Sequence, residues 1–176
     1  TLLSIGGYIY NVGERSLWVE QYISNDASTE IAGEAIDINM TSGFPSDGKV
    51  AISIGADEPT EFTLYLRVPY WSRGISLKLN GETIDATADE NGYIALSREW
   101  KSGDEIELEF GMEVIFEQTN EKVTANAGYV ALRRGPLVYC AEYPDNTFIP
   151  SRAYIDMNST PELVAIESLD NANDPY

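Results

Sequence analysis

Carboxylates are the side chains of this chain with the greatest capacity for chemistry. The sequence holds 29 Asp and Glu residues among 176. Two carboxylates at a suitable separation can hydrolyse a glycosidic bond, one as the acid and the other as base or nucleophile. Spacing along the chain singles out no such pair, because strand register is not fixed by the sequence. We therefore predict no catalytic residue in this chain.

Histidine is absent, and Cys140 is the single cysteine. Without histidine there is no Ser–His or Cys–His nucleophile pair and no imidazole acid–base group, and most zinc sites are excluded. One cysteine also excludes an internal disulfide. Because Cys140 ends the apolar run LVYC at 137–140, we predict a small buried core residue rather than a reactive thiol.

The segment DATADENG at 85–92 is weakly similar to a calcium loop, with carboxylate and amide oxygens before a glycine. It lacks the distal bidentate Glu, since the chain continues as YIAL. We favour a hairpin connection for this segment, and we predict no metal site and no cofactor in the chain.

The adjacent aromatics Tyr70 and Trp71 are the candidate sugar platform, because an exposed ring can stack on the apolar face of a sugar. Arg67 or Arg73 could then bind sugar hydroxyls. The favoured alternative is that Trp71 plugs one end of the fold or contacts a neighbouring domain. For Arg134, within Arg133-Arg134, we expect a structural or interdomain ion pair with the abundant acidic residues.

The net charge of −18 argues against two classes of partner. Nucleic acids need clustered Lys and Arg to replace phosphate counterions, and anionic membranes attract basic surfaces. We expect a solvated acidic surface and predict neither partner. Nothing in the sequence assigns a compartment.

Alternating apolar residues predict the elements that position these groups. About ten short strands with period-2 patterns are separated by Gly- and Pro-containing turns. Asn80-Gly81 is the strongest hairpin signal, and FTLYLRV at 62–68 is the clearest strand. We predict an all-β fold, an antiparallel β-sandwich of jelly-roll type.

Changes in polarity predict three parts of the chain. Residues 1–14 form a lead-in, residues 15–117 form the main sandwich, and residues 118–176 either complete that sandwich or begin a second one. The polar interval 117–126 is the expected boundary.

Several runs, in order and at similar spacing, resemble the β-L-arabinofuranosidase family of glycoside hydrolases, formerly a domain of unknown function. The resemblance covers about residues 1–146 and rests on LWVEQYI at 17–23, GFPSDGKV at 43–50, LYLRVPYW at 64–71, LNGE at 79–82, REWKSGD at 98–104 and RRGPLVYC at 133–140. One departure is Gly111, where the family commonly has proline.

This resemblance implies a parent enzyme with an α/α-barrel catalytic domain followed by β-sandwich domains. Its nucleophile would be a cysteine near zinc, within an adjacent cysteine pair, with glutamate partners in the barrel. No position here matches those motifs, so neither the catalytic role nor the zinc transfers to Cys140. We expect the chain to start just past that active site.

The leading hypothesis is a non-catalytic accessory sandwich that packs on the upstream α/α barrel of the same polypeptide. The alternative is an independent carbohydrate-binding module for plant-type glycans containing arabinose. A third hypothesis is a purely structural or assembly domain. Tyr70, Trp71 and Arg134 are the residues expected to face carbohydrate or the neighbouring domain.

Overall fold

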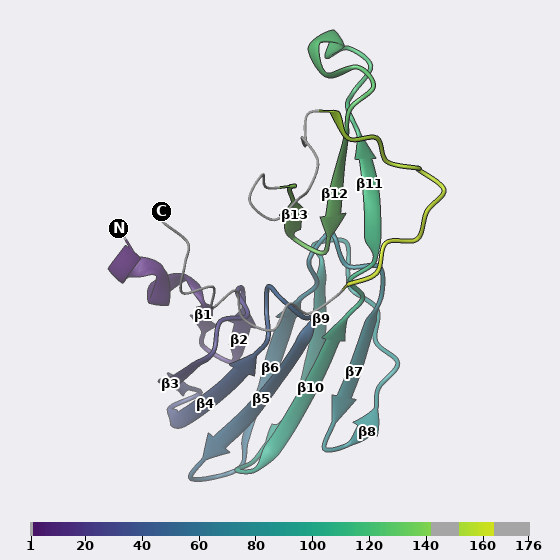
Figure 1. Ribbon diagram of the computed structural model, residues 1–176. Helices are drawn as coiled ribbons and strands as arrows, with labels where there is room; N and C mark the ends of the chain where they lie inside the picture. The colour runs from purple at the N-terminus through teal and green to yellow at the C-terminus, as the bar shows by residue number, and fades with distance from the viewer. Residues whose placement is uncertain (1, 142–151, 164–176) are drawn as a thin grey trace, which may run out of the picture.

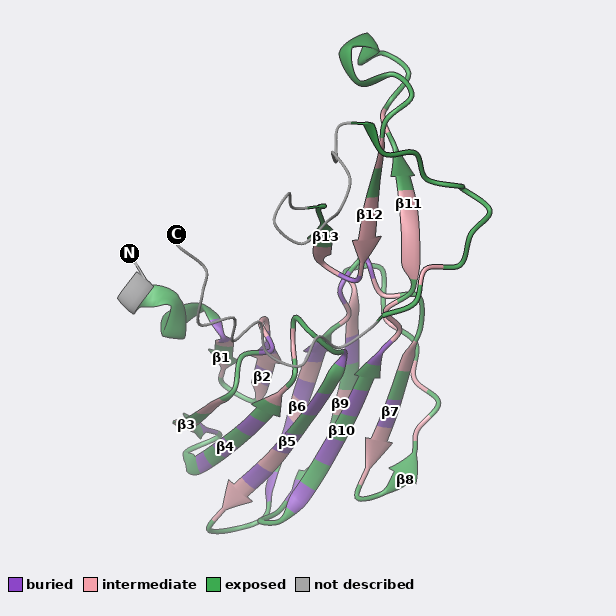
Figure 2. Ribbon diagram, viewed as in Figure 1, coloured by how far each residue is buried: buried purple, intermediate pink, exposed green. Residues whose placement is uncertain are grey.

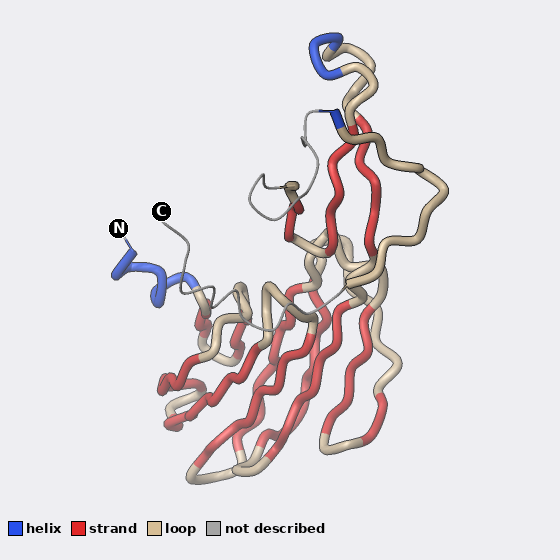
Figure 3. The backbone as a smooth tube through the Cα atoms, in the orientation of Figure 1, coloured by secondary structure: helices blue, strands red, loops and turns tan. Residues whose placement is uncertain are grey.

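The computed structural model describes residues 2–141 and 152–163 and contains thirteen strands and two short 3-10 helices (Figure 1). Nearly all regular structure is strand (Figure 3). No helix in the described residues is long and apolar enough to span a membrane. The all-β prediction is confirmed, with thirteen strands in place of about ten. Three strands were not predicted. Strands β1 (Tyr10–Gly13) and β8 (Glu82–Thr83) are too short to show a pattern, and β3 (Asn25–Ile31) lacks alternating apolar residues.

Two sheets form the sandwich. Sheet A has the order β1-β2-β6-β9 and contains β1 (Tyr10–Gly13), β2 (Ser16–Val19), β6 (Thr60–Arg67) and β9 (Tyr93–Trp100). Sheet B has the order β3-β4-β5-β10-β7-β8 and contains β3 (Asn25–Ile31), β4 (Glu34–Ser42), β5 (Lys49–Ala56), β10 (Asp104–Phe110), β7 (Ile75–Leu79) and β8 (Glu82–Thr83). All their pairs are antiparallel except β2 with β6, which run parallel. The sandwich is therefore mixed at one point in sheet A.

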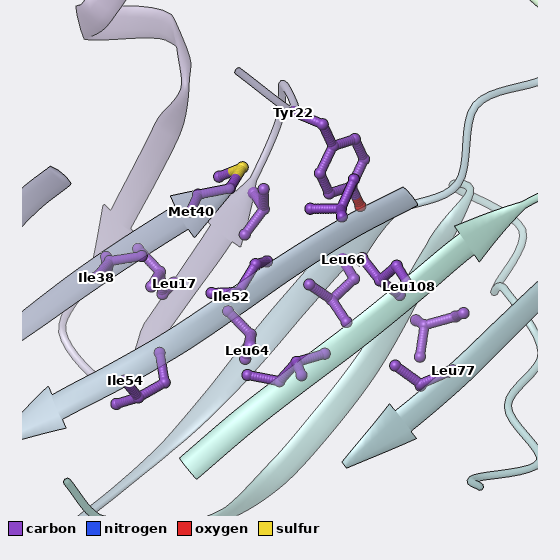
Figure 4. Close-up of a cluster of buried hydrophobic side chains, with 14 of the residues drawn as sticks. Leu17, Tyr22, Ile38, Met40, Ile52, Ile54, Leu64, Leu66, Leu77 and Leu108 are labelled. Carbon is purple, nitrogen blue, oxygen red and sulfur yellow. The ribbon is translucent and has the colours of Figure 1, made fainter. Parts of the chain in front are cut away.

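Strict alternation of residue type creates the core between the two sheets. In β10 every second residue from Asp104 to Phe110 is buried, and the residues between them are exposed. Leu17, Leu64 and Leu66 of sheet A point into the same apolar cluster as Ile52 and Leu108 of sheet B (Figure 4). Burying each such side chain contributes about 1.5–3 kcal/mol. This two-sided burial holds the sheets together.

The hairpin predicted at Asn80-Gly81 is confirmed. Both residues have positive φ, 52° and 80°, as a two-residue turn between right-twisted strands requires. Leu79 pairs with Glu82 across this turn.

Strand β3 and the segment before it differ from the predicted pattern. The alternating apolar residues of 17–23 favour one continuous strand, but β2 ends at Val19 and the chain then crosses to sheet B. The following β3 reads NDASTEI, in which only Ile31 is a large apolar residue, and Ile31 is its one buried residue. Its pairing with β4 sets its conformation, so its own sequence carries little strand signal.

Sheet C stands beyond one end of the sandwich (Figure 1). It contains β11 (Val114–Gln118), β12 (Val130–Arg134) and β13 (Leu137–Tyr139), and the 3-10 turn η2 (Thr124–Asn126) lies between β11 and β12. The other 3-10 helix, η1 (Leu2–Tyr8), lies in the predicted lead-in. Strand β11 straddles the predicted boundary between 117 and 118. Residues 142–151 and 164–176 of the predicted continuation lie outside the described residues.

Cys140 is exposed, so the prediction of a buried core residue is wrong. Its apolar run belongs to sheet C, whose described strands carry intermediate and exposed residues rather than a core (Figure 2). Val138 in the same run is 66% exposed. An apolar run predicts burial only where a second layer covers the strand.

Candidate functional site

Trp71 lies at the end of the sandwich from which sheet C projects. Pro69 ends β6 because it cannot donate to a sheet ladder, and the chain then turns inward. The Trp71 ring is 7% exposed. It stacks on Phe44 at 5.8 Å and meets the edge of Phe110 at 6.1 Å. Trp71 therefore plugs this end of the core, and its ring has no free face for a sugar.

The burial of Trp71 agrees with the favoured alternative, in which this ring plugs one end of the fold, and argues against its role in the candidate sugar platform. Gly135 lies close to the Trp71 ring, since a Cβ at Gly135 would be 3.4 Å from that ring. Gly135 also has a φ of +57°, which favours glycine. The turn between β12 and β13 thus fits against the tryptophan.

Tyr70 has the opposite environment and is 89% exposed. It follows Pro69 at the tip of the turn, so its ring points to solvent while that of Trp71 points inward. A single ring this exposed can serve a partner surface. Among the described residues, no other aromatic ring is recorded in contact with it.

Arg134 connects sheet C to the sandwich. Its Nη1 donates to the backbone oxygen of Ser46, in the loop after β4, at 2.8 Å. The neighbouring Arg133 forms an ion pair of 2.6 Å with Glu117 of β11, and its Nη1 donates to the Gly135 oxygen at 2.7 Å. The ion pair predicted for these arginines belongs to Arg133, whereas Arg134 binds a backbone oxygen.

An open groove of about 600 Å³ runs along this junction. Its lining is mainly polar and includes Asp47, Lys49, Arg73, Glu109, Met112 and Arg134. The structure thus brings Arg134 and Trp71 to the same junction, Trp71 beneath it and Arg134 on its surface.

The buried carboxylate Asp104 has a structural role. Asp104 is 1% exposed and accepts from Asn80 Nδ2 at 2.8 Å and from the Lys101 N–H at 3.0 Å. Arg98 lies 3.6 Å away. Burial acts to raise the pKa of Asp104, but these hydrogen bonds and the Arg98 charge outweigh burial and lower it. Asp104 therefore stays ionised and ties the β7–β8 hairpin to the β9–β10 turn.

The segment 85–92 joins β8 of sheet B to β9 of sheet A and turns at Glu90-Asn91, so it is a crossover between the sheets and the predicted hairpin connection is wrong. Asp89 accepts the N–H groups of Asn91 and Tyr93, both at 2.9 Å, and these bonds lower its pKa. Both of these backbone donors bind the same oxygen, Oδ1. Within the described residues no cluster of three or more His, Cys, Asp or Glu side chains could hold a metal ion. The zinc that the family resemblance implies finds no ligand set among them.

A second cluster on the outer face of sheet A was not singled out by the sequence. The rings of Trp18 and Tyr65 stack there with centroids 4.7 Å apart and an interplanar angle of 5°. Beside them the Tyr93 hydroxyl donates to Glu20 Oε2 at 2.7 Å, and this bond raises the pKa of Tyr93. The alternating pattern of β2 and β6 could have indicated these exposed aromatic rings, because Trp18 and Tyr65 occupy outward positions of strands whose alternate residues are buried.

Together these features define an all-β protein in which a sandwich is followed by a small third sheet. Two family models match the chain in that order: "Beta-L-arabinofuranosidase, GH127 middle domain" over residues 16–112, and "Glycoside hydrolase family 127 C-terminal domain" over residues 114–173. The chain belongs to glycoside hydrolase family 127, which confirms the resemblance read from its motifs.

Individual relatives agree with this assignment. The non-reducing end beta-L-arabinofuranosidase of Bifidobacterium longum subsp. longum is 37% identical over 153 residues, which are 82% of this chain and 22% of that protein. The GH127 beta-L-arabinofuranosidase of Geobacillus stearothermophilus T6 has a similar structure, with a TM-score of 0.73 and 42% identity over 78% of this chain and 22% of that one. A second GH127 beta-arabinofuranosidase structure has a TM-score of 0.77 and 33% identity over 82% of this chain and 25% of that one. The chain spans about a fifth to a quarter of the length of these relatives.

Proposed function

We propose that this chain is a non-catalytic accessory region of a GH127 glycoside hydrolase and that it packs on and supports an α/α-barrel catalytic domain of the same polypeptide. One observation carries the proposal. The chain matches the middle and C-terminal domain models of the family and corresponds to only 22% of the B. longum arabinofuranosidase. The hydrolytic chemistry would then lie in the part of the enzyme that this chain does not match.

The side chains of this chain support the proposal that hydrolysis takes place in another part of the enzyme. The sequence has no histidine, and its one cysteine stands on the surface of sheet C. The two carboxylates with lowered pKa values, Asp89 and Asp104, are held by groups of their own turns and hairpins. These two acids stabilise structure and are not available as an acid–base pair.

The end of the sandwich near Tyr70 is the surface we propose for the neighbouring domain. Tyr70 is almost fully exposed, and aromatic residues of this kind are enriched at protein interfaces. The junction groove with Arg73 and Arg134 adjoins the same end of the fold. Trp71 packs on Phe44 and lies against Gly135, so the core is filled at this end and can support a neighbouring domain.

A chimera tests the supporting role. This chain would replace the matching region of the B. longum enzyme, and the same enzyme lacking that region would be the comparison. We expect the chimera to be more soluble, to unfold at a higher temperature and to release more arabinose from a β-L-arabinofuranoside than the truncated enzyme. A truncated enzyme as stable and active as the chimera would show that the region has no supporting role.

A further inference from the structure

The outer face of sheet A differs from that of sheet B. Outward residues of sheet B around β4, β5 and β10 are small, polar or charged, as at Asn39, Ser53 and Glu105. Sheet A instead presents the stacked pair Trp18 and Tyr65, both only partly buried. The pair exists because β2 and β6 run parallel with these two residues in register.

Tyr65 has one covered ring face and one open face. Trp18 covers the face toward β2, so the other face looks toward β9, where the register partner of Tyr65 is Ala95. Ala95 is exposed, and its methyl group leaves the space beside the ring unfilled. Since β9 is the edge strand of sheet A, this space is also open at the side. We call the surface formed by Tyr65 and Ala95 the sheet A shelf.

Two hydroxyl groups lie at one end of the shelf. Thr63 and Ser97 pair directly across β6 and β9, two residues from Tyr65 and Ala95 on the same face. Their hydroxyl oxygens lie 2.8 Å apart. Each hydroxyl has both donor and acceptor capacity, so the pair can still bind a further hydroxyl.

Tyr93 and Arg67 lie at the other end of the shelf. They pair across β9 and β6, and the Tyr93 hydroxyl reaches Glu20, which follows β2. The Tyr93 ring must therefore cross over β6 and close the shelf. Arg67 Nη1 donates to the Glu20 backbone oxygen at 3.1 Å. The Arg67 side chain is exposed and has five N–H donors, so others remain for a ligand.

We propose that the sheet A shelf binds one ring of a neutral sugar. The C–H face of the sugar would stack on the open face of Tyr65 over Ala95, with its hydroxyls bound by Arg67 at one end and by Thr63 and Ser97 at the other. These polar groups are already fixed by hydrogen bonds, which lowers the entropic cost of binding. The net charge of −18 disfavours an anionic ligand.

The kind of sugar rests on the proposed function, which favours glycans that contain L-arabinose. The shelf itself is independent of it, since stacking and hydroxyl binding would serve any neutral ring of suitable size. Sugar binding here also does not depend on Trp71, whose ring is buried in the core.

Amide chemical shifts of the ¹⁵N-labelled chain, titrated with methyl β-L-arabinofuranoside and arabino-oligosaccharides, test the proposal. We expect shifts confined to residues around Tyr65, Ala95 and Ser97, with millimolar affinity, which corresponds to about −4 kcal/mol. No shift at the shelf with these sugars or with xylo-oligosaccharides, at up to roughly ten times a millimolar dissociation constant, would overturn the proposal. Shifts with xylo-oligosaccharides alone would support the shelf and contradict the arabinose assignment taken from the proposed function.

Two matched variants locate the site. Ala95→Leu fills the shelf without removing any hydrogen-bonding group, and we expect it to weaken binding at least about tenfold. The same substitution at Ala51, which is exposed on β5 of the opposite sheet, should leave affinity unchanged. Tyr65→Ala should abolish the shifts. Equal affinity in Ala95→Leu and Ala51→Leu would place the sugar elsewhere and contradict the assignment.

Discussion

Among single residues, Tyr70 and Trp71 show how environment separates two aromatics that are adjacent in sequence. Trp71 fills the end of the core against Phe44 and Phe110, whereas Tyr70 points to solvent. Residue type and spacing predicted an aromatic pair with two alternative roles. Which ring turns inward depends on the turn after Pro69 and on the glycine that packs beneath it, so the sequence alone could not assign it.

The Trp71→Ala substitution should destabilise the protein by about 3–5 kcal/mol, because it removes a buried ring and leaves a cavity. Tyr70→Ala is the matched control and should change the free energy of unfolding by less than about 0.5 kcal/mol. Urea denaturation of both variants measures this. Similar values for the two substitutions would contradict the placement of Trp71 in the core.

Asp104 makes stability depend on pH in the acidic range. Its pKa in the folded protein lies below the ordinary value of 3.8, so the unfolded chain binds more protons between those two values. The stabilisation is complete above pH 3.8 and is lost as the pH falls through the folded pKa. We predict that Asp104→Asn loses less unfolding free energy than the wild type between about pH 5 and pH 2.

Asn80→Gly provides a second test of the Asp104 network. It removes the amide donor but keeps a residue that accepts positive φ, and it should also flatten the pH dependence. Urea denaturation across this pH range measures both variants. An unchanged slope in both would show that Asp104 is not the titrating group.

At the scale of elements, the sequence predicted strands that bury large side chains on one face and missed those that do not. Strand β6 and the Asn80-Gly81 hairpin carry clear local signals and were predicted correctly. Strand β3 is formed by pairing with β4, and the parallel contact of β2 with β6 joins residues far apart in the chain. Neither leaves a local pattern, and the sheet A shelf, which depends on that parallel contact, could not be derived from the sequence.

Sheet C should depend on Arg134 for its position. Arg134→Ala removes the bond from β12 to the Ser46 oxygen and should cost about 1 kcal/mol of the stability of this attachment. Amide hydrogen exchange should become faster in β11 and β12 and in the 44–48 loop, while the sandwich strands keep their protection. Uniform acceleration across both sheets of the sandwich would contradict a local tie.

At the scale of the whole molecule, a rigid two-sheet core presents three different surfaces. One end carries Tyr70, the junction groove and sheet C. The outer face of sheet A carries the shelf. The outer face of sheet B carries small, polar and charged residues. The family models divide the chain between residues 112 and 114, where the sandwich gives way to sheet C. This organisation is consistent with the proposed accessory role.

The chain belongs to glycoside hydrolase family 127, and we propose that it does no hydrolysis itself. The purified chain should be incubated with a β-L-arabinofuranoside beside an equimolar amount of the B. longum arabinofuranosidase, with released arabinose as the readout. We predict arabinose release from the B. longum enzyme and none from the chain above the rate without protein. Release by the chain that is abolished by substituting one of its own carboxylates would contradict the account.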